Sequence, residues 1–308
     1  MTFLYKSDPV RGEVWARHFA AHAPEVPFRT WPDVGDPAAV RYLAAWTLPD
    51  NLATTFPNLE VLFCVGAGVD QLDLSNVPAG ITVVRMIEPG LVDGMVEFAT
   101  LAVLALHRDW PAYLAQQRAR QWHALPVRRA ASRRVGVMGM GVLGCAVLAK
   151  LRGFGFPCAG WSRTLRPAEG IECFAGAQSL PAFLARTEIL VSLLPLTEST
   201  RGLLGQRVFE ALPRGAALVS VGRGAQVVQE DLLAALDAGQ LSAAVLDVTS
   251  PEPLPPEHPL WAHPRVIITP HIASETQPES SAHAILENVL RHRRGEPLVG
   301  VVDRSRGY

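Results

Sequence analysis

The sequence of 308 residues has only four cysteines, and none of them forms a CxxC pair. They are Cys64, Cys145, Cys158 and Cys173. Such wide spacing argues against a disulfide framework or a cysteine-rich zinc site and favours a reducing, cytoplasmic compartment. The nine histidines are also scattered, and His258, His263 and His271 lack the spacing of recognised metal ligands. We therefore expect no metal site.

Long apolar runs and an excess of one charge are absent as well. The longest apolar stretch, around residues 98–106, falls short of the ~18 residues that a membrane-spanning helix needs. The first eight residues carry a charge and no apolar signal core. Lysine and arginine (28) nearly balance aspartate and glutamate (29), so no global field attracts nucleic acid or an anionic membrane. The composition, 49% hydrophobic and 19% charged, predicts a globular protein.

Short apolar runs alternate with amphipathic stretches along the chain, which is the pattern of an α/β protein with parallel sheets. Strands are expected at residues 2–5, 42–46, 61–65, 82–84, 134–138, 157–161, 189–192, 216–221, 243–248 and 266–269, and helices at 10–22, 48–56, 90–107, 110–122, 145–151 and 275–295. The length suggests about two domains at roughly 150 residues each. The basic segment at 128–134 is the best candidate for a crossing between domains.

A glycine-rich motif follows the strand expected at 134–138 and opens a helix. In this GxGxxG motif, Gly139 makes the tight turn, Gly141 lets the backbone approach a pyrophosphate, and Gly144 allows helix and strand to pack closely. The phosphate charge would then lie on the amides of Val142 and Leu143 at the helix N-terminus. A GxGxxG alone is a weak signal, but its strand–turn–helix context predicts a dinucleotide site.

The residues after the next strand indicate which dinucleotide binds. A site that prefers NAD carries an acidic residue about 20 positions beyond the motif, where it binds the ribose hydroxyls. This sequence has no Asp or Glu between Gly144 and Glu169, and its strand leads into Ser162, Arg163 and Thr164. A guanidinium flanked by hydroxyls suits a 2′-phosphate, although a solvated surface arginine is the alternative. The pattern favours NADPH over NADH.

Three later strands each lead into polar residues that a core would exclude. Arg223 lies between two glycines, Asp247 and Glu252 follow the next strand, and His271 follows the last one. In an open parallel sheet, the carboxyl ends of the strands open onto the crevice that holds the dinucleotide. Each residue alone has a structural explanation, as a turn residue, a solvated acid or a structural histidine. Their joint placement favours a catalytic set of Arg223, Glu252 and His271.

Seven segments, taken in order, resemble the D-isomer-specific 2-hydroxyacid dehydrogenases, in particular their glyoxylate/hydroxypyruvate reductase branch. They are residues 66–70, 96–97, 139–144, 195–200, 221–224, 252–254 and 269–274, and residues 139–145 and 155–163 look especially like that branch. Two departures bear on the nicotinamide pocket. Ser192 stands where many relatives carry asparagine, and the residues between Ser220 and Arg223 differ from the usual Asn-Ala-Arg-Gly pattern.

The resemblance implies two Rossmann-like or flavodoxin-like domains with parallel sheets. The substrate domain would be discontinuous, formed by residues 1–102 and 276–308, and the coenzyme domain would span 103–275. Family members are typically homodimers, joined through the coenzyme domain and its first long helix. Further cofactor contacts implied by the resemblance are Leu194, Pro195, Thr200, Val221, Gly222, Arg223, Asp247, His271, Ala273 and Ser274.

The resemblance also implies substrate contacts and a reaction. The substrate carboxylate would bind backbone amides of Gly66, Ala67 and Gly68, and Trp46 is a candidate wall of the pocket, although a plain glycine turn and a core tryptophan are the alternatives. The expected activity is reduction of small 2-oxo acids, such as glyoxylate and hydroxypyruvate, to 2-hydroxy acids by hydride transfer from NADPH.

The catalytic roles follow from the needs of that reaction. Histidine suits proton transfer near neutral pH, so His271 is the expected general acid, with Glu252 on its other ring nitrogen. Arg223 would bind the carboxylate and the carbonyl oxygen with its planar fork.

Three alternatives stay open. They are a dehydrogenase of a larger D-2-hydroxy acid, a nucleotide-sensing binding protein of the same fold, and a formate-type dehydrogenase. Glutamate at position 252, where the formate-type enzymes use glutamine, argues against the last. The intact catalytic set argues against a protein that has lost catalysis.

Overall fold

The computed structural model describes residues 1–307, which divide into two compact units. The smaller unit comprises Met1–Asp93 and Glu275–Tyr308, and the larger comprises Gly94–Ser274. The first division lies nine residues before the expected boundary at 102/103, inside one continuous helix, α3 (Pro89–His107). Because a helix gives no break in pattern at that point, the sequence offered no signal for it. The predicted α/β class with parallel sheets is confirmed.

The smaller unit has a five-stranded parallel sheet with strand order β2-β1-β3-β4-β5, which is a flavodoxin-like order. Its strands are β1 (Thr2–Lys6), β2 (Phe28–Thr30), β3 (Val40–Ala45), β4 (Val61–Cys64) and β5 (Thr82–Val84). Its helices are α1 (Pro9–His22), α2 (Leu52–Thr55) and α9 (Pro278–Arg293), with the short 3-10 turns η1 (Pro37–Ala39) and η2 (Leu74–Asn76).

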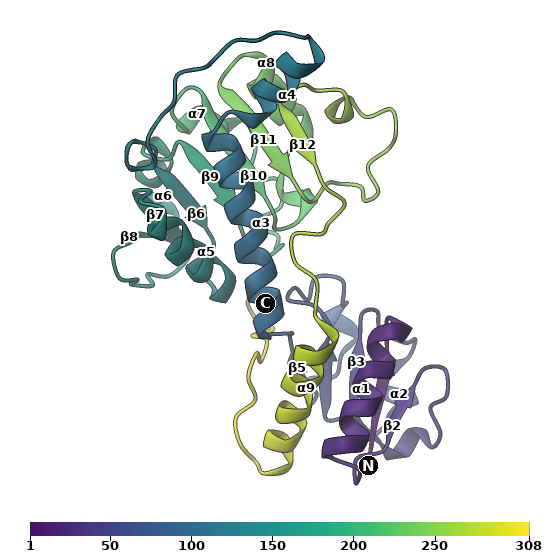
Figure 1. The fold of residues 1–308 in the computed structure, drawn as a ribbon. Helices are drawn as coiled ribbons and strands as arrows, with labels where there is room; N and C mark the ends of the chain where they lie inside the picture. Colours follow the sequence, from purple (N-terminus) through teal and green to yellow (C-terminus); the bar gives the residue numbers. More distant parts are fainter. Residues whose placement is uncertain (308) are drawn as a thin grey trace. The chain divides into compact units, whose positions relative to one another are not determined.

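Helices α1 and α9 pack side by side in this unit (Figure 1). An aromatic cluster, built on Phe3, Trp15 and Phe19, fills the space between them and the sheet. The Trp15 indole donates a buried 2.9 Å hydrogen bond to the Ser281 hydroxyl, so the one polar atom of this large side chain is satisfied. The helix expected at 48–56 is reduced to the single turn α2.

The larger unit has a seven-stranded parallel sheet with strand order β12-β11-β10-β9-β6-β7-β8. Its strands are β6 (Val135–Met138), β7 (Cys158–Ser162), β8 (Glu172–Ala175), β9 (Ile189–Ser192), β10 (Ala216–Ser220), β11 (Leu241–Leu246) and β12 (Val266–Ile268). The order of connections reverses between β6 and β9. Such a reversal is the switch point at which open α/β sheets bind their ligands.

The two faces of this sheet are covered by different helices. Beyond α3, these are α4 (Trp110–Arg118), α5 (Val142–Gly153), α6 (Gly176–Ala185), α7 (Gln206–Ala211) and α8 (Gln229–Asp237), with the turns η3 (Ala130–Ser132), η4 (Gly224–Gln226) and η5 (Pro259–Trp261). Val137 and Val191 belong to the apolar cluster of α3 and α5, whereas Leu190 and Leu218 belong to that of α6, α7 and α8. This alternation is the period of a strand buried on both faces.

Among the described helices, α3 is long and apolar enough to cross a bilayer by length and composition alone. Within the larger unit, Ala99, Ala102, Val103 and Leu106 of this helix are buried in the core beside the sheet. This packing accounts for the apolar residues on one side of α3, as in the core helix of a globular protein.

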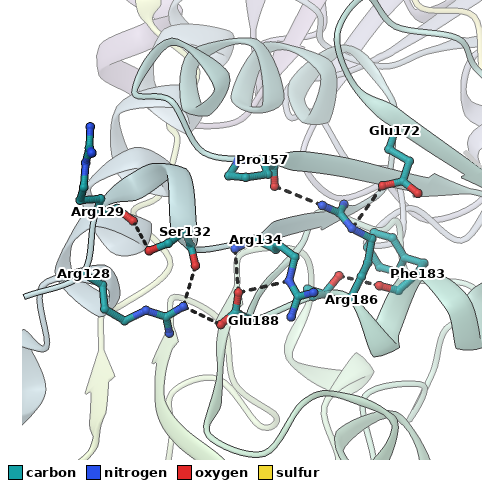
Figure 2. Close-up of polar contacts among 10 residues, drawn as sticks. Arg128, Arg129, Ser132, Arg134, Pro157, Glu172, Phe183, Arg186 and Glu188 are labelled. Atoms are coloured by element: carbon teal, nitrogen blue, oxygen red, sulfur yellow. Dashed lines mark hydrogen bonds and ion pairs between the residues drawn. The ribbon is translucent and has the colours of Figure 1, made fainter.

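The basic segment at 128–134 lies within the larger unit, so the expectation that it crosses between domains is wrong. Figure 2 shows Arg128 and Arg134 on either side of Glu188, at 2.9 and 3.3 Å, at the amino end of β9. Burial acts to raise the pKa of Glu188, but hydrogen bonds from the Arg134 backbone and the Arg128 side chain, with both positive charges, hold that pKa below its usual value. The charges that suggested a linker thus pair with Glu188 at the amino end of the central strand β9.

Candidate active site

The glycine motif forms the loop between β6 and α5, at the switch point of the larger sheet. Gly139 has a φ of 106°, in the region that favours glycine, and a Cβ there would lie 2.7 Å from the carbonyl oxygen of Leu193. A Cβ at Gly144 would lie 1.8 Å from the carbonyl oxygen of Gly139. At both positions, only glycine leaves room for the neighbouring backbone carbonyl oxygen.

Gly141 differs, because a Cβ there would meet no atom within 4 Å. Gly141 is the N-cap of α5, and no side-chain hydrogen bond caps this helix end in the described structure. Val142 and Leu143 are the first residues of α5, whose amides have no acceptor within the helix, and such a helix N-terminus beside the open space at Gly141 suits an anionic group. The open space at Gly141 and the uncapped N-terminus of α5 both fit the pyrophosphate of a dinucleotide.

The segment after β7 carries the cluster expected to select the dinucleotide. Arg163 and Thr164 are exposed, whereas Ser162 is buried and its hydroxyl donates to the Thr164 carbonyl oxygen at 2.8 Å. Arg166 reaches back to the glycine loop, where its Nη1 lies 3.4 Å from the Met140 carbonyl oxygen. The strand end beside the glycine loop therefore carries exposed cationic groups, in a stretch of sequence without a carboxylate.

The loop after β9 lies on the other side of the switch point. It contains Leu194 and Pro195, and the Thr200 hydroxyl donates to the Pro195 carbonyl oxygen at 2.7 Å. The backbone of Thr197 in turn donates to Thr200 at 2.8 Å. These bonds hold the loop in a compact turn next to Gly139.

Arg223 follows β10 in a tight turn that leads into η4. Val221 and Gly222 are buried, Arg223 is partly buried, and its Nη1 donates to the Gly222 carbonyl oxygen at 2.8 Å. A Cβ at Gly224 would lie 1.8 Å from the carbonyl oxygen of Thr249, so this turn abuts the loop that carries the glutamate. The backbone of Thr249 donates to Oε1 of Glu252 at 3.0 Å.

Glu252 and His271 form a direct pair. Oε2 of Glu252 lies 2.8 Å from Nδ1 of His271, and both side chains are 38% exposed. Strands β10, β11 and β12 are neighbours, which explains how residues 223, 252 and 271 come from adjacent loops at one edge of the sheet. The structure thus brings together the glutamate and histidine of the expected set, with the Arg223 turn against their loop.

Asp247 holds the backbone that carries His271. Its buried carboxylate accepts hydrogen bonds from the Thr269 hydroxyl (2.6 Å) and from the amides of Ile272 and Ala273 (2.8 Å each). Its own carbonyl oxygen accepts from the His271 amide at 2.8 Å. These bonds stabilise the left-handed backbone of His271, whose φ of 56° is unusual for a residue other than glycine.

The sequence predicts a cofactor contact at Asp247. It does not predict that the Asp247 carboxylate binds the backbone next to His271. No local pattern could have shown it, because its partners lie 22 to 26 residues further along the chain. Ser274, the last cofactor residue expected from the resemblance, lies just beyond this loop and within 3.2 Å of a Cβ built on Gly94.

Two serines lie at the ends of neighbouring strands beside the glycine loop. Ser192 of β9 is in register with Ser220 of β10, and both are fully buried. Their hydroxyls have no hydrogen-bond partner among the described residues. Ser192 is one of the two departures from the family pattern, and Ser220 directly precedes the other, at residues 221–222.

In the smaller unit, the loop of Gly66, Ala67 and Gly68 follows β4. Its three residues are partly exposed, and a Cβ at Gly66 would lie 3.0 Å from the Trp46 ring. Trp46 itself is 44% exposed, so it is not a core residue. The loop and the tryptophan therefore form one surface of this unit.

Comparison with known proteins agrees with this geometry. Residues 100–273 match the model of the D-isomer specific 2-hydroxyacid dehydrogenase NAD binding domain. Glyoxylate/hydroxypyruvate reductase A from Yersinia enterocolitica is 38% identical over 314 residues, covering 100% of both chains. The chain therefore belongs to the D-isomer specific 2-hydroxyacid dehydrogenase family.

Solved structures agree in fold. A family member from Xanthobacter autotrophicus Py2, in complex with NADPH and MES, has a TM-score of 0.94 and 40% identity, covering 100% of this chain and 99% of that one. An NADPH-dependent glyoxylate/hydroxypyruvate reductase from Sinorhizobium meliloti, in complex with NADP and sulfate, has a TM-score of 0.89 and 34% identity, with coverage of 100% and 99%.

Proposed function

We propose that this protein is an NADP-dependent oxidoreductase that reduces small 2-oxo acids, of the size of glyoxylate and hydroxypyruvate, to 2-hydroxy acids. The observation that carries the proposal is the 2.8 Å pair of Glu252 and His271, placed at the same sheet edge as a dinucleotide loop. A histidine oriented by a carboxylate is the arrangement that proton transfer to a carbonyl oxygen needs. The similarity to glyoxylate/hydroxypyruvate reductases along the whole chain supports the substrate class.

NADPH is the proposed cofactor, and when bound it supplies the hydride. The amides of Val142 and Leu143 would hold its pyrophosphate, and Arg163 with Thr164 would hold its 2′-phosphate. Exposed positive charge after β7, without a carboxylate, supports the preference for the phosphorylated form. Leu194, Pro195 and Thr200 would border the nucleotide on the other side of the switch point, with Val221, Gly222, Asp247, Ala273 and Ser274.

The chain's own groups divide the remaining work. With Nδ1 engaged by Glu252, His271 presents Nε2 to the substrate and gives the proton to the carbonyl oxygen as negative charge develops there. Glu252 fixes the ring and stabilises the imidazolium. Arg223 binds the carboxylate and polarises the carbonyl with its planar guanidinium.

The amides of Gly66, Ala67 and Gly68 are proposed as a further hold on the substrate carboxylate. The loop residues are partly exposed, and glycines at 66 and 68 have no side chain that would keep a ligand from the backbone, which supports the role. Trp46, in contact with Gly66, would limit the size of the substrate side chain. A Trp46→Ala variant that accepts bulky 2-oxo acids no better than the natural protein would contradict that limit.

We also propose a homodimer. Three large apolar side chains on α3, α4 and the segment after them are exposed, Leu101 by 63%, Trp110 by 56% and Trp122 by 104%, and contact with a second copy of this chain would bury them. The mass in solution by light scattering tests this, and Leu101→Asp should convert dimers to monomers.

A cytoplasmic location is proposed because none of the four cysteines takes part in a disulfide among the described residues. Burial raises the pKa of Cys158 to about 11, so this thiol stays protonated and unreactive at neutral pH. Recovery of the protein outside the cytoplasm on cell fractionation would contradict the location.

The first experiment measures loss of reduced-nicotinamide absorbance with NADPH and NADH in parallel. The substrates are glyoxylate, hydroxypyruvate, pyruvate and one bulky 2-oxo acid. We expect turnover of the two small acids, faster with NADPH. Tight NADPH binding without turnover of any acid would instead indicate a nucleotide-sensing protein.

A further inference from the structure

Gln226 is a fully buried glutamine at the end of η4, three residues beyond Arg223. Its side-chain Nε2 donates to the carbonyl oxygens of Leu194 and Pro195, at 2.9 Å each. Its Oε1 accepts from the backbone amide of Arg223 at 3.1 Å. Both amide protons and the carbonyl oxygen are therefore engaged, which is the complete use of a buried side-chain amide.

These bonds join two loops that the sequence separates by about 30 residues. One is the loop after β9, expected to border the nucleotide, and the other is the turn that carries the arginine. The fit is close, since a Cβ at Gly222 would lie 2.4 Å from Oε1 of Gln226 and 2.8 Å from the carbonyl oxygen of Leu194. The side-chain amide of Gln226 thus bridges the Arg223 turn and the loop of Leu194 and Pro195.

We propose that Gln226 is a positioning residue for the reaction: it fixes the Arg223 turn against the 194–195 loop, so that the guanidinium and the nucleotide are held in one geometry. This inference rests on the proposed function for the role of Arg223. A hydrocarbon at position 226 would remove the donor to the Leu194 carbonyl oxygen, one of the two donors to the Pro195 carbonyl oxygen and the acceptor of the Arg223 amide, and the two loops would separate. Misplacement of a substrate-binding group by about 1 Å can reduce the rate about 100-fold.

Gln240 provides a matched control. Its Nε2 also donates to two backbone carbonyl oxygens, of Phe209 at 2.8 Å and Leu212 at 3.0 Å, but it precedes β11 at the opposite edge of the sheet. We expect both Gln226→Leu and Gln240→Leu to lower the thermal midpoint, Gln226→Leu by more because Gln226 is fully buried and Gln240 only partly. Only Gln226→Leu should lower kcat/KM for glyoxylate, by about 100-fold, with kcat reduced more than KM is raised.

Gln226→Glu keeps the shape and tests the chemistry. An ionised carboxylate cannot donate to the two carbonyl oxygens, whereas a protonated one can donate to one of them and still accept from the Arg223 amide. The ratio of its kcat/KM to that of the natural protein should therefore rise about fivefold or more from about pH 8 to about pH 5.5. If Gln226 only filled space in the core, this ratio of kcat/KM values would not change with pH.

The outcomes separate this inference from the proposed function. If Gln226→Leu keeps kcat/KM within about threefold of Gln240→Leu, or if the Gln226→Glu ratio is flat with pH, the positioning role is wrong. If the natural protein reduces none of the 2-oxo acids, the proposed function fails, and the positioning of the loops is judged from NADPH affinity alone. A Kd raised about tenfold in Gln226→Leu, relative to Gln240→Leu, then supports it, and equal Kd values overturn it.

Discussion

Oε2 of Glu252 and Nδ1 of His271 lie 2.8 Å apart, on loops that follow neighbouring strands of the larger sheet. The contact fixes which ring nitrogen is available for chemistry, because only Nε2 is left to meet a substrate. The Asp247 carboxylate accepts hydrogen bonds from the amides of Ile272 and Ala273, which fixes the backbone next to the histidine. Orientation of the imidazole is therefore built into the fold before any ligand binds.

His271→Ala should abolish nearly all turnover, with kcat for glyoxylate lower by about 100-fold to 10,000-fold, because the proton donor is removed. NADPH affinity, measured by fluorescence titration, should stay close to that of the natural protein. If the variant keeps most of its kcat, His271 is not the general acid.

Glu252→Gln separates the charge of the glutamate from its hydrogen bond. The amide oxygen of the variant still accepts from Nδ1, but the imidazolium loses its counter-charge, so kcat should fall about tenfold to 100-fold. The decline of kcat/KM on the alkaline side should begin at lower pH than in the natural protein. An unchanged pH profile would show that only the hydrogen bond matters.

Arg163→Asp should raise the KM for NADPH by about 100-fold and that for NADH far less, since the new carboxylate repels a 2′-phosphate and can accept from ribose hydroxyls. Steady-state kinetics with both cofactors measure the ratio. Arg201→Asp, a charge reversal of an exposed arginine on the same unit, is the control. Equal losses for NADPH and NADH in Arg163→Asp would show that Arg163 does not read the phosphate.

The glycine loop and the meeting of Glu252 with His271 could be predicted from the sequence, because the loop is local and both residues follow strand ends. Gly139, Gly141 and Gly144 sit in one turn, and Glu252 and His271 follow adjacent parallel strands, so the general geometry of an open sheet predicts where they meet. The central strands were found by their apolar runs. The edge strands β2 and β8 were missed, because each is short and partly exposed, without the continuous apolar run of a buried strand.

What the sequence could not show are contacts between residues far apart in the chain. Glu188 neutralises Arg128 across 60 residues, and without that partner the basic segment looked like a linker. Gln226 reads as an ordinary turn residue until Leu194 and Pro195 are placed beside it. Such partners are set by how the sheet is assembled, and no pattern of spacing along the chain specifies them.

Glu88→Ala should lower the free energy of unfolding of the smaller unit by about 2–4 kcal/mol, because this buried carboxylate serves two helix ends. It accepts from the amides of Gly90 and Leu91 at the start of α3, and from the Gln277 amide and the Ser280 hydroxyl at the start of α9. Urea denaturation followed by tryptophan fluorescence measures the change.

Asp73→Ala is the control for the Glu88 variant. Asp73 is an exposed cap of the short turn η2 in the same unit, and its loss should lower the free energy of unfolding much less than the loss of Glu88. Equal losses in the two variants would mean that the double cap gives no stability beyond that of an ordinary surface cap.

The pH dependence of stability in the smaller unit should depend on His18. Burial, followed by the charges of His22 and His283, lowers the pKa of His18 below its ordinary value. The His18 and His22 rings stack at 4.4 Å, and His283 meets His18 edge-on at 6.1 Å from α9. Protonation is therefore disfavoured in the folded chain, and the unfolded chain binds the proton first.

The sign follows from linkage. Stability from neutral His18 is fully present above the ordinary histidine pKa of about 6.5 and is lost as pH falls from there through the lowered pKa of the folded state. His18→Gln cannot be protonated, so its urea midpoint should fall less than that of the natural protein between about pH 7 and pH 5. His123→Gln, at an exposed position of the larger unit, should leave that fall unchanged. If His18→Gln loses as much stability on acidification as the natural protein, the histidine cluster of α1 and α9 does not set the acid sensitivity.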